Sequence, residues 1–303
     1  MQNDFVIALH FAKKGKDMSK YKEKIMHGVF LGAALVSIAA VVLICLFLFV
    51  NGIPAMAKIG VFDFLLGTKW APNNEPASYG IWPMILGSIY ITVGAVILGV
   101  PIGIMTAIFL SRFCNKKIYK IIKPGIELLA GIPSVVYGFF GMIVLVPFVR
   151  NTFGGRGYGV LTASILLAIM ILPTIVSVSE SALNAVPSSY YEGALALGST
   201  KEMSVFKTVV PAAKSGILAG VVLAVGRAIG ETMAVILVAG NSPVVPDGIL
   251  SGVRTLTTNI VIEMGYATDL HREALIATGV VLFVLILIIN LLFAIIKNKG
   301  AKS

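Results

Sequence analysis

Residues 188–215 read SSYYEGALALGSTKEMSVFKTVVPAAKS, a polar stretch with helical patterning between two long apolar segments. The run SYYE at 189–192 fits a capping box at the start of a short helix, and Gly198 suits the end of that helix. The run STKE at 199–202 fits a second capping box, and Pro211 is expected to end the helix that follows. We therefore expect two short helices joined at a glycine, shaped to dock into another protein.

The segments on both sides of this stretch are apolar and long enough to cross a lipid bilayer, which takes about 20 helical residues. Of the 303 residues, 57% are hydrophobic and 13% are charged, whereas soluble domains are about 45–50% apolar and about 25% charged. We expect an all-α polytopic membrane protein with about six transmembrane helices. The expected spans are Ile25–Val50, Ile81–Leu110, Ile121–Val149, Gly159–Ser179, Gly216–Ala239 and Glu273–Ile296.

The lysines and arginines predict how these spans are oriented. If the N-terminus is cytoplasmic, 17 of the 24 basic residues lie on the inner side and six on the outer side, with Arg227 inside a span. Positive charge collects on the cytoplasmic side of membrane proteins. We therefore expect both termini and the 188–215 stretch in the cytoplasm, and we attribute the net charge of +10 to topology and not to nucleic-acid binding.

One transmembrane domain, residues 25–296, is expected between two cytoplasmic tails, a basic tail at 1–24 and a short one at 297–303. The first span is longer than the apolar region of a signal peptide, and no small-residue cleavage site follows it, so we do not expect a cleaved leader. Met18 is a plausible alternative start.

Small and aromatic residues add expectations about packing. Glycines four residues apart let membrane helices approach closely. Aromatic residues at the ends of spans anchor them at the membrane interface. The glycine pairs are Gly28/Gly32, Gly99/Gly103, Gly216/Gly220 and Gly226/Gly230, and the aromatic residues are Trp70, Tyr79 and Trp82.

Arg227 is the charged residue that the fifth span carries near its middle. At 1.5 Å per residue it lies about 17 Å beyond Gly216, and the hydrocarbon core is about 30 Å thick. An arginine there costs at least about 2.5–3.5 kcal/mol and is kept only with a partner or a polar cavity. Glu231 lies one turn further on, followed by Thr232. The pair is either an ion pair that locks the bundle or part of an anion pathway, in which arginine offers its planar fork of donors and Glu231 orients it. We favour the pathway.

The third span contains the run GIPS at 131–134. Pro133 removes a backbone hydrogen bond and kinks or breaks the helix. A broken helix frees N–H groups that can face an anion, and Ser134 adds a hydroxyl donor. A kink needed only for packing explains the motif equally well. Glu127, four residues after Lys123, is expected to be a paired structural charge.

A family resemblance emerges in the 188–215 stretch. Glu192, Ala194, Gly198 and Pro211 resemble the EAA loop of ABC-importer permeases, whose pattern is E-A-A-x3-G-x9-I-x-L-P. The resemblance implies a type I permease bundle in which this loop is the coupling helix that sits in a groove of a cytosolic ATPase. Three positions depart from the pattern, namely Gly193, Thr208 and Val210.

Within that family the chain resembles the phosphate-specific branch, in residues 226–234 and 131–139. The Thr-Met-Ala ending after Glu231 resembles the PstC-type subunit, whereas the PstA-type sister usually reads Thr-Ala-Pro there. The outer runs RTLTT at 254–258 and IEMG at 262–265 are also PstC-like. The resemblance covers the chain from about Tyr21 to Ile296.

This resemblance implies a partner set and a cargo. A PstA-type sister subunit completes a heterodimer, a dimer of PstB-type ATPase subunits drives it, and an extracytoplasmic PstS-type binding protein delivers inorganic phosphate. The outer loops 51–80 and 241–272 are expected to receive that binding protein. The chain itself is expected to use no cofactor and to sit in the cell membrane as a multi-pass protein.

Two other classes of function compete with an importer subunit. An ion-gradient-driven secondary anion transporter often has inverted repeats, but the Arg-Glu segment is not repeated in the first half of the chain. A membrane enzyme needs a catalytic constellation, and the sequence offers no histidine pair or metal-ligand spacing. The GxxxxG spacing from Gly193 to Gly198 lacks the lysine of a phosphate-binding loop, because Ser199 stands there. We expect ATP hydrolysis on a partner subunit.

Overall fold

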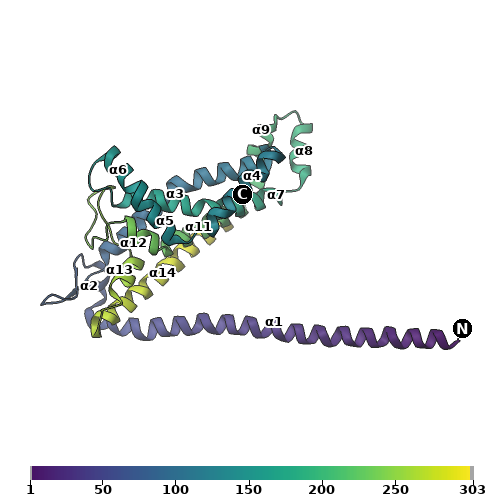
Figure 1. The fold of residues 1–303 in the computed structure, drawn as a ribbon, viewed down its shortest axis with the longest axis horizontal. Helices are drawn as coiled ribbons and strands as arrows, with labels where there is room; N and C mark the ends of the chain where they lie inside the picture. The colour runs from purple at the N-terminus through teal and green to yellow at the C-terminus, as the bar shows by residue number, and fades with distance from the viewer. Residues whose placement is uncertain (1, 301–303) are drawn as a thin grey trace. The chain divides into compact units, whose positions relative to one another are not determined.

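The computed structural model describes the backbone of residues 2–300 and the side chains of residues 23–295. The chain forms two compact units, Met1–Asn51 and Gly52–Ser303. The described part of the first unit, residues 2–51, lies within helix α1, which spans Gln2–Ile59 (Figure 1). The expected boundary after residue 24 is therefore not a break in the helix, and the division into tails and domain stays a prediction.

Within the first unit, two polar side chains of the described segment bond to the backbone of the helix itself. Ser37 donates a hydrogen bond to the carbonyl of Ala33 (2.9 Å), and Asn51 donates one to the carbonyl of Phe47 (2.7 Å). Polar groups in a lipid-facing helix need such local partners because the bilayer core offers none. The segment Glu23–Ile59 is long and apolar enough to cross a membrane.

The second unit is a helical bundle with a small two-stranded hairpin in which Trp70 pairs with Tyr79. Three segments, labelled η, are π-helical. After α1 the elements are α2 (Val61–Leu66), β1 (Trp70–Ala71), β2 (Ser78–Tyr79), α3 (Trp82–Ile108), η1 (Phe109–Phe113), α4 (Lys116–Gly131), α5 (Ser134–Phe140), η2 (Gly141–Leu145), α6 (Val146–Phe153), α7 (Val160–Asn184), α8 (Ser188–Ala196), α9 (Lys201–Ser204), η3 (Val205–Val209), α10 (Val210–Ala212), α11 (Lys214–Gly230), α12 (Met233–Val238), α13 (Leu256–Glu263) and α14 (Asp269–Gly300).

Helix α7 is the centre of this unit, and α3 and α11 pack against it. Two of the expected glycine pairs make these close approaches possible. A Cβ on Gly103 would lie 2.7 Å from a methyl carbon of Ile175, and one on Gly216 would lie 2.4 Å from the Cβ of Ala182. Gly99 and Gly220 face α7 in the same way, whereas the described structure places nothing within 4 Å of a Cβ on Gly226 or Gly230.

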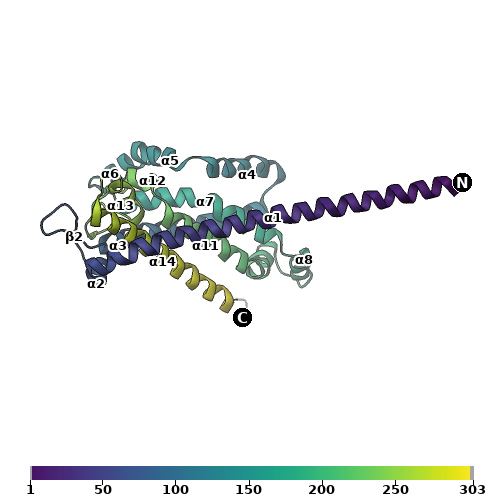
Figure 2. The ribbon, with the colours of Figure 1, turned by 90° about the horizontal axis from the view of Figure 1, so that it is seen from below.

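The two ends of the second unit differ. Helices α8 and α9 project at one end, and α2, α6 and the hairpin lie at the other (Figures 1 and 2). The EAA-like stretch is therefore separated from the hairpin by the length of the bundle.

Five described helices are long and apolar enough to span a membrane, and a sixth span results if Lys201–Ala212 and Lys214–Gly230, bent by 69°, count as one. The expected all-α polytopic class is thereby confirmed. Two expected spans are not continuous helices, however. The third divides into an amphipathic α4 and a span at Ser134–Phe153 (Figure 2), and the fifth divides between α11 and α12.

Candidate functional site

The first break lies between α11 and α12 at Glu231, four residues after Arg227. Helix α11 ends at Gly230, and Glu231 has extended backbone angles (φ −69°, ψ 133°). Oε1 of Glu231 accepts hydrogen bonds from the backbone N–H groups of Thr232 (3.1 Å) and Ala234 (3.2 Å). Its carboxylate therefore satisfies donors that the start of α12 leaves unpaired. The hydroxyl of Thr257 fixes the break by donating to the Glu231 carbonyl (3.0 Å).

This geometry corrects the expected intrahelical pair of Arg227 and Glu231. The four-residue spacing places two side chains on one face only while the helix continues, and α11 stops one residue before Glu231. Among the residues whose side chains are described, none forms a hydrogen bond or ion pair with Arg227. The guanidinium lies in the last turn of α11 and is exposed on the surface of this chain.

The second break lies between α4 and α5, as Pro133 predicts. Ile132 and Pro133 are extended (ψ 127° and 140°), and Ser134 is the first residue of α5. The hydroxyl of Tyr137 reaches back across the break and donates to the carbonyl of Leu129 (2.8 Å). Proline breaks the helix here, and a tyrosine satisfies one of the carbonyls that the break frees.

The two breaks belong to neighbouring elements, because α5 packs on α12. A Cβ on Gly138 would lie 3.1 Å from the Cα of Ala234, so the two backbones approach closely. Tyr137 shares a buried apolar cluster with Ala228 and Ala234. Two motifs about 90 residues apart in sequence, one with Ser134 and one with Arg227 and Thr232, are thus brought to one region.

The EAA-like stretch forms two short helical segments, as expected. Gly198 has φ +88°, and its N–H bonds to the carbonyl of Leu195 (2.9 Å) while the N–H of Ser199 bonds to that of Ala194 (3.1 Å). This pair of bonds is a Schellman motif, which favours glycine because the backbone is left-handed there. The predicted glycine stop of α8 is confirmed.

The two capping boxes predicted for this stretch do not form as expected. Pro187 is the N-cap of α8, so the box at 189–192 does not form. Thr200, not Ser199, caps α9 by accepting from the N–H of Met203 (3.2 Å). The second helical segment ends at Ala212, one residue after Pro211, and the chain bends by 69° before α11, so the predicted helix end at Pro211 is confirmed.

The surface of this stretch is apolar at several points. Leu197 is 90% exposed, and Tyr190, Met203 and Phe206 are each about half exposed. These exposed apolar side chains are available to contact another protein. Of the four expected coupling residues, Glu192, Gly198 and Pro211 are exposed and Ala194 is half-buried.

An ion pair that the sequence did not predict joins α4 to α7. Glu180 is 3% exposed, and its two carboxylate oxygens accept hydrogen bonds from the Tyr119 hydroxyl (2.8 Å) and the Lys123 ammonium (2.7 Å). The bond to Glu180, with burial adding to it, raises the pKa of the Tyr119 hydroxyl. Lys123 also lies 3.7 Å from Glu127, which confirms Glu127 as a paired charge, although it is exposed.

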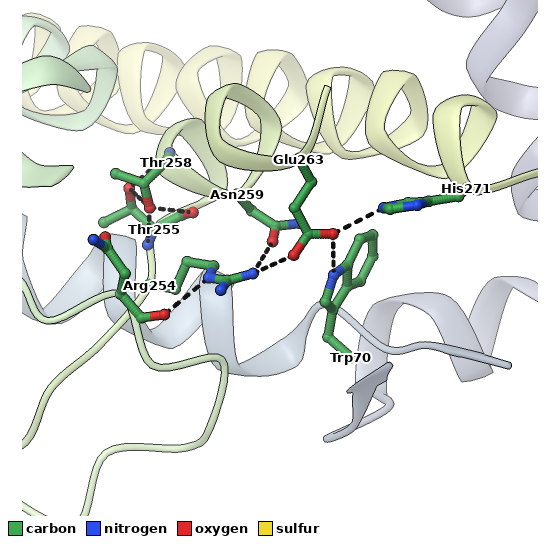
Figure 3. A network of polar contacts seen from close by, with 8 residues as sticks. Trp70, Arg254, Thr255, Thr258, Asn259, Glu263 and His271 are labelled. Atoms are coloured by element: carbon green, nitrogen blue, oxygen red, sulfur yellow. Dashed lines mark hydrogen bonds and ion pairs between the residues drawn. The ribbon is translucent and has the colours of Figure 1, made fainter. Parts of the chain in front are cut away.

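A second buried network lies at the opposite end of the bundle (Figure 3). Glu263, 5% exposed, binds Arg254 through Oε1, and through Oε2 it accepts from the indole N–H of Trp70 (2.9 Å) and contacts Nε2 of His271 (2.8 Å). Asn259 accepts a further bond from Arg254 (3.0 Å). Trp70 is 6% exposed and is part of this network, so its expected place as an interface anchor is wrong.

Each network includes a contact between distant parts of the chain, which a single sequence does not reveal: Lys123 and Glu180 are 57 residues apart, and Trp70 and Glu263 are 193 residues apart. The sequence indicates only that a buried charge is costly and needs a partner; it does not show which residue that partner is.

Comparison with known proteins places these features in a family. A family model described as the inner membrane component of binding-protein-dependent transport systems matches residues 99–300. The chain belongs to this family. As an inner membrane component it is a multi-pass permease subunit and not an enzyme, and the family model covers both breaks and the EAA-like stretch.

Curated members of this transport family cover most of the chain. A probable ABC transporter permease protein, YqgH, of Bacillus subtilis is 40% identical over 271 residues, covering 88% of each chain. The phosphate transport system permease protein PstC of Mesorhizobium japonicum is 34% identical over 288 residues, covering 88% of this chain and 87% of its own. A probable PstC of Methanocaldococcus jannaschii is 33% identical, with 83% and 86% covered.

Solved structures of ABC importers share the fold. A permease chain from a bacterial alginate ABC transporter aligns with a TM-score of 0.64 at 17% identity, covering 93% of this chain and 98% of its own. A chain of the MetNI methionine ABC transporter aligns at 0.58 with 19% identity, covering 72% and 96%. At these identities the likeness establishes the permease fold and not the cargo.

Proposed function

We propose that this chain is the PstC-type, channel-forming subunit of an ATP-driven importer of inorganic phosphate. Relatives that carry the name PstC support the cargo. The observation that carries the proposal is Arg227, an exposed arginine without a partner among the described side chains, at a break in a membrane helix. Such a charge needs an anion or water in a polar cavity, and phosphate is an anion.

The pathway runs along the two helix breaks. Arg227 supplies the positive charge, and Ser134 and Thr232 supply hydroxyl groups next to backbone that leaves the helix. Charge-assisted hydrogen bonds from a guanidinium hold a phosphate oxygen strongly. Glu231 holds the start of α12 and places a negative charge nearby, which weakens anion binding enough to permit release.

Orientation and partners follow from the distribution of charge and of exposed surface. We place the α8–α9 end in the cytoplasm, because 17 of the 24 basic residues then lie inside. The exposed apolar side chains around Gly198 then meet a dimer of PstB-type ATPase subunits. A PstA-type sister closes the open face of Arg227, Gly226 and Gly230. A PstS-type binding protein delivers phosphate to loops 51–80 and 241–272.

A transport assay with the whole complex in proteoliposomes tests this proposal. Radiolabelled phosphate, delivered by its binding protein, should accumulate when ATP is supplied to the ATPase side and should not accumulate without ATP. Dissipating ion gradients with ionophores should leave uptake unchanged, because the importer uses ATP. Uptake that follows the ion gradient and ignores ATP would establish a secondary transporter instead. ATP-dependent uptake of sulfate with no uptake of phosphate would refute the cargo.

A further inference from the structure

The buried ion pair of Glu180 with Lys123 has no part in the anion pathway or in the surface of the EAA-like stretch. Both carboxylate oxygens of Glu180 are occupied, one by Tyr119 and one by Lys123. The side chains of Glu180 and Lys123 are 4% and 18% exposed. A pair held at both oxygens and shielded from water has one arrangement, whereas apolar contacts between helices can slide.

The position of Glu180 connects it to the coupling loop, residues 188–215. Helix α7 ends at Asn184, and Pro187 caps α8. Glu180 therefore lies in the last turns of the helix that leads into this loop. The end of α7 is also fixed from η1, where the Ser111 hydroxyl bonds to Asn184 (2.6 Å) and Arg112 bonds to the carbonyl of Leu183. A movement of the coupling loop thus acts first on the end of α7.

The position of Lys123 connects the pair to the first half of the anion pathway. Helix α4 ends at Gly131, eight residues after Lys123, which is about 12 Å at 1.5 Å per residue. The break at Pro133 and the hydroxyl of Ser134 follow directly. Helix α4 has no fully buried residue, and its partly buried side chains Tyr119, Ile122 and Ile126 pack on the apolar cluster that contains Leu183 of α7. The ion pair of Lys123 with Glu180 is thus the charged contact that attaches α4 to α7.

We propose that Lys123 and Glu180 are positioning residues that transmit movement of the coupling loop to the α4–α5 break. When the ATPase moves the loop, the end of α7 moves with it, and the ion pair carries α4 along as a rigid lever. The break at Pro133 is the hinge, so the surroundings of Ser134 change with the state of the ATPase. This inference rests on the proposed function for its cargo but not for its mechanical link.

The test uses the complete complex in proteoliposomes and measures phosphate uptake and ATP hydrolysis on the same samples. In Lys123→Met we expect ATP hydrolysis within twofold of wild type and uptake reduced at least fivefold, so that more ATP is used per phosphate. Lys123→Arg keeps the charge and should keep uptake within twofold. The matched control is Lys120→Met, which removes an exposed lysine of the same helix. Reversing the pair, Lys123→Glu with Glu180→Lys, should recover at least half of the lost uptake.

A labelling experiment keeps the link testable whatever the cargo is. In a background with Cys45→Ala and Cys114→Ala, a small charged thiol reagent reports on Ser134→Cys with and without ATP and vanadate. ATP should change the labelling rate, and Lys123→Met should reduce that change at least threefold while Lys120→Met leaves it intact. Equal changes in both variants would overturn the link. So would uptake and hydrolysis that fall together with the amount of assembled complex. Failure of phosphate uptake in the wild type would refute the cargo alone.

Discussion

Removing the charge of Glu263 should destabilise the end of the bundle that carries the hairpin. In Glu263→Gln the amide replaces one acceptor oxygen by a donor, so either Arg254 or both Trp70 and His271 face an N–H group instead of an oxygen. Breaking a buried ion pair by removing one partner costs about 3–5 kcal/mol. Arg254 keeps its bonds to Asn259 and to the carbonyl of Asn241. We therefore take the lower end, about 3 kcal/mol.

The assay is thermal unfolding of the purified complex in detergent. For a domain of 150–250 residues each kcal/mol shifts the midpoint by about 2–4 °C, so Glu263→Gln should lower it by about 6–12 °C. Trp70→Phe removes one hydrogen bond and should lower it by a third of that or less, since a hydrogen bond contributes about 1 kcal/mol.

The matched control is Glu273→Gln, a carboxylate at the same end that pairs with Lys58 (2.7 Å) and is 40% exposed. Surface pairs contribute about 0–1 kcal/mol, so this variant should stay within about 4 °C of the wild type. A Glu263→Gln midpoint no lower than that of Glu273→Gln would refute the reasoning that the buried network stabilises this end.

Three further predictions follow from single contacts. Gly138→Val should prevent the packing of α5 on α12 and abolish phosphate uptake, because the valine side chain would meet Leu237 and the backbone of Ala234. Phosphate uptake near the wild-type rate would contradict the close approach of the α5 and α12 backbones. Gly198→Val places a β-branched side chain at φ +88° and should weaken ATPase association, measured by co-purification, whereas Gly193→Ala in the open middle of α8 should not. The pKa of Tyr119 is raised in the fold, so the contribution of its hydroxyl to stability is complete below about pH 10 and is lost as the pH rises further. The thermal midpoint of the wild type should therefore fall more steeply above about pH 10 than that of Tyr119→Phe. Parallel curves would show that this hydroxyl is not linked to folding.

The apolar runs predicted the fold well, because a membrane span is set by length and hydropathy alone. The break at Pro133 and the glycine stop at Gly198 were also predictable, since each depends on a residue with a special backbone. The second capping box failed by one residue, because Ser199 and Thr200 are adjacent and both can cap. The first box failed by two residues, because Pro187 holds the N-cap position that was expected at Ser189.

The break at Glu231 could not be predicted in this way. Its neighbours carry no proline, and the spacing from Arg227 fits a continuous helix. The break is stabilised by tertiary contacts, namely the hydroxyl of Thr257, 26 residues later, and the turn of the Glu231 carboxylate to the backbone of α12. The same holds for Glu180, whose partners lie on a helix 57 residues earlier in the chain. The sequence pattern shows which charged residues would be costly to bury, whereas their partners are seen only in the folded structure.

The most direct test of the account compares phosphate uptake by the whole complex with Arg227 intact and in Arg227→Gln, with assembly and ATPase association followed in parallel. Arg156→Gln, an exposed arginine in a loop, is the matched control. The account predicts that Arg227→Gln assembles normally and loses at least nine-tenths of its uptake, while Arg156→Gln transports at the wild-type rate. Full uptake in an assembled Arg227→Gln complex would contradict the claim that this arginine lies in the path of the anion.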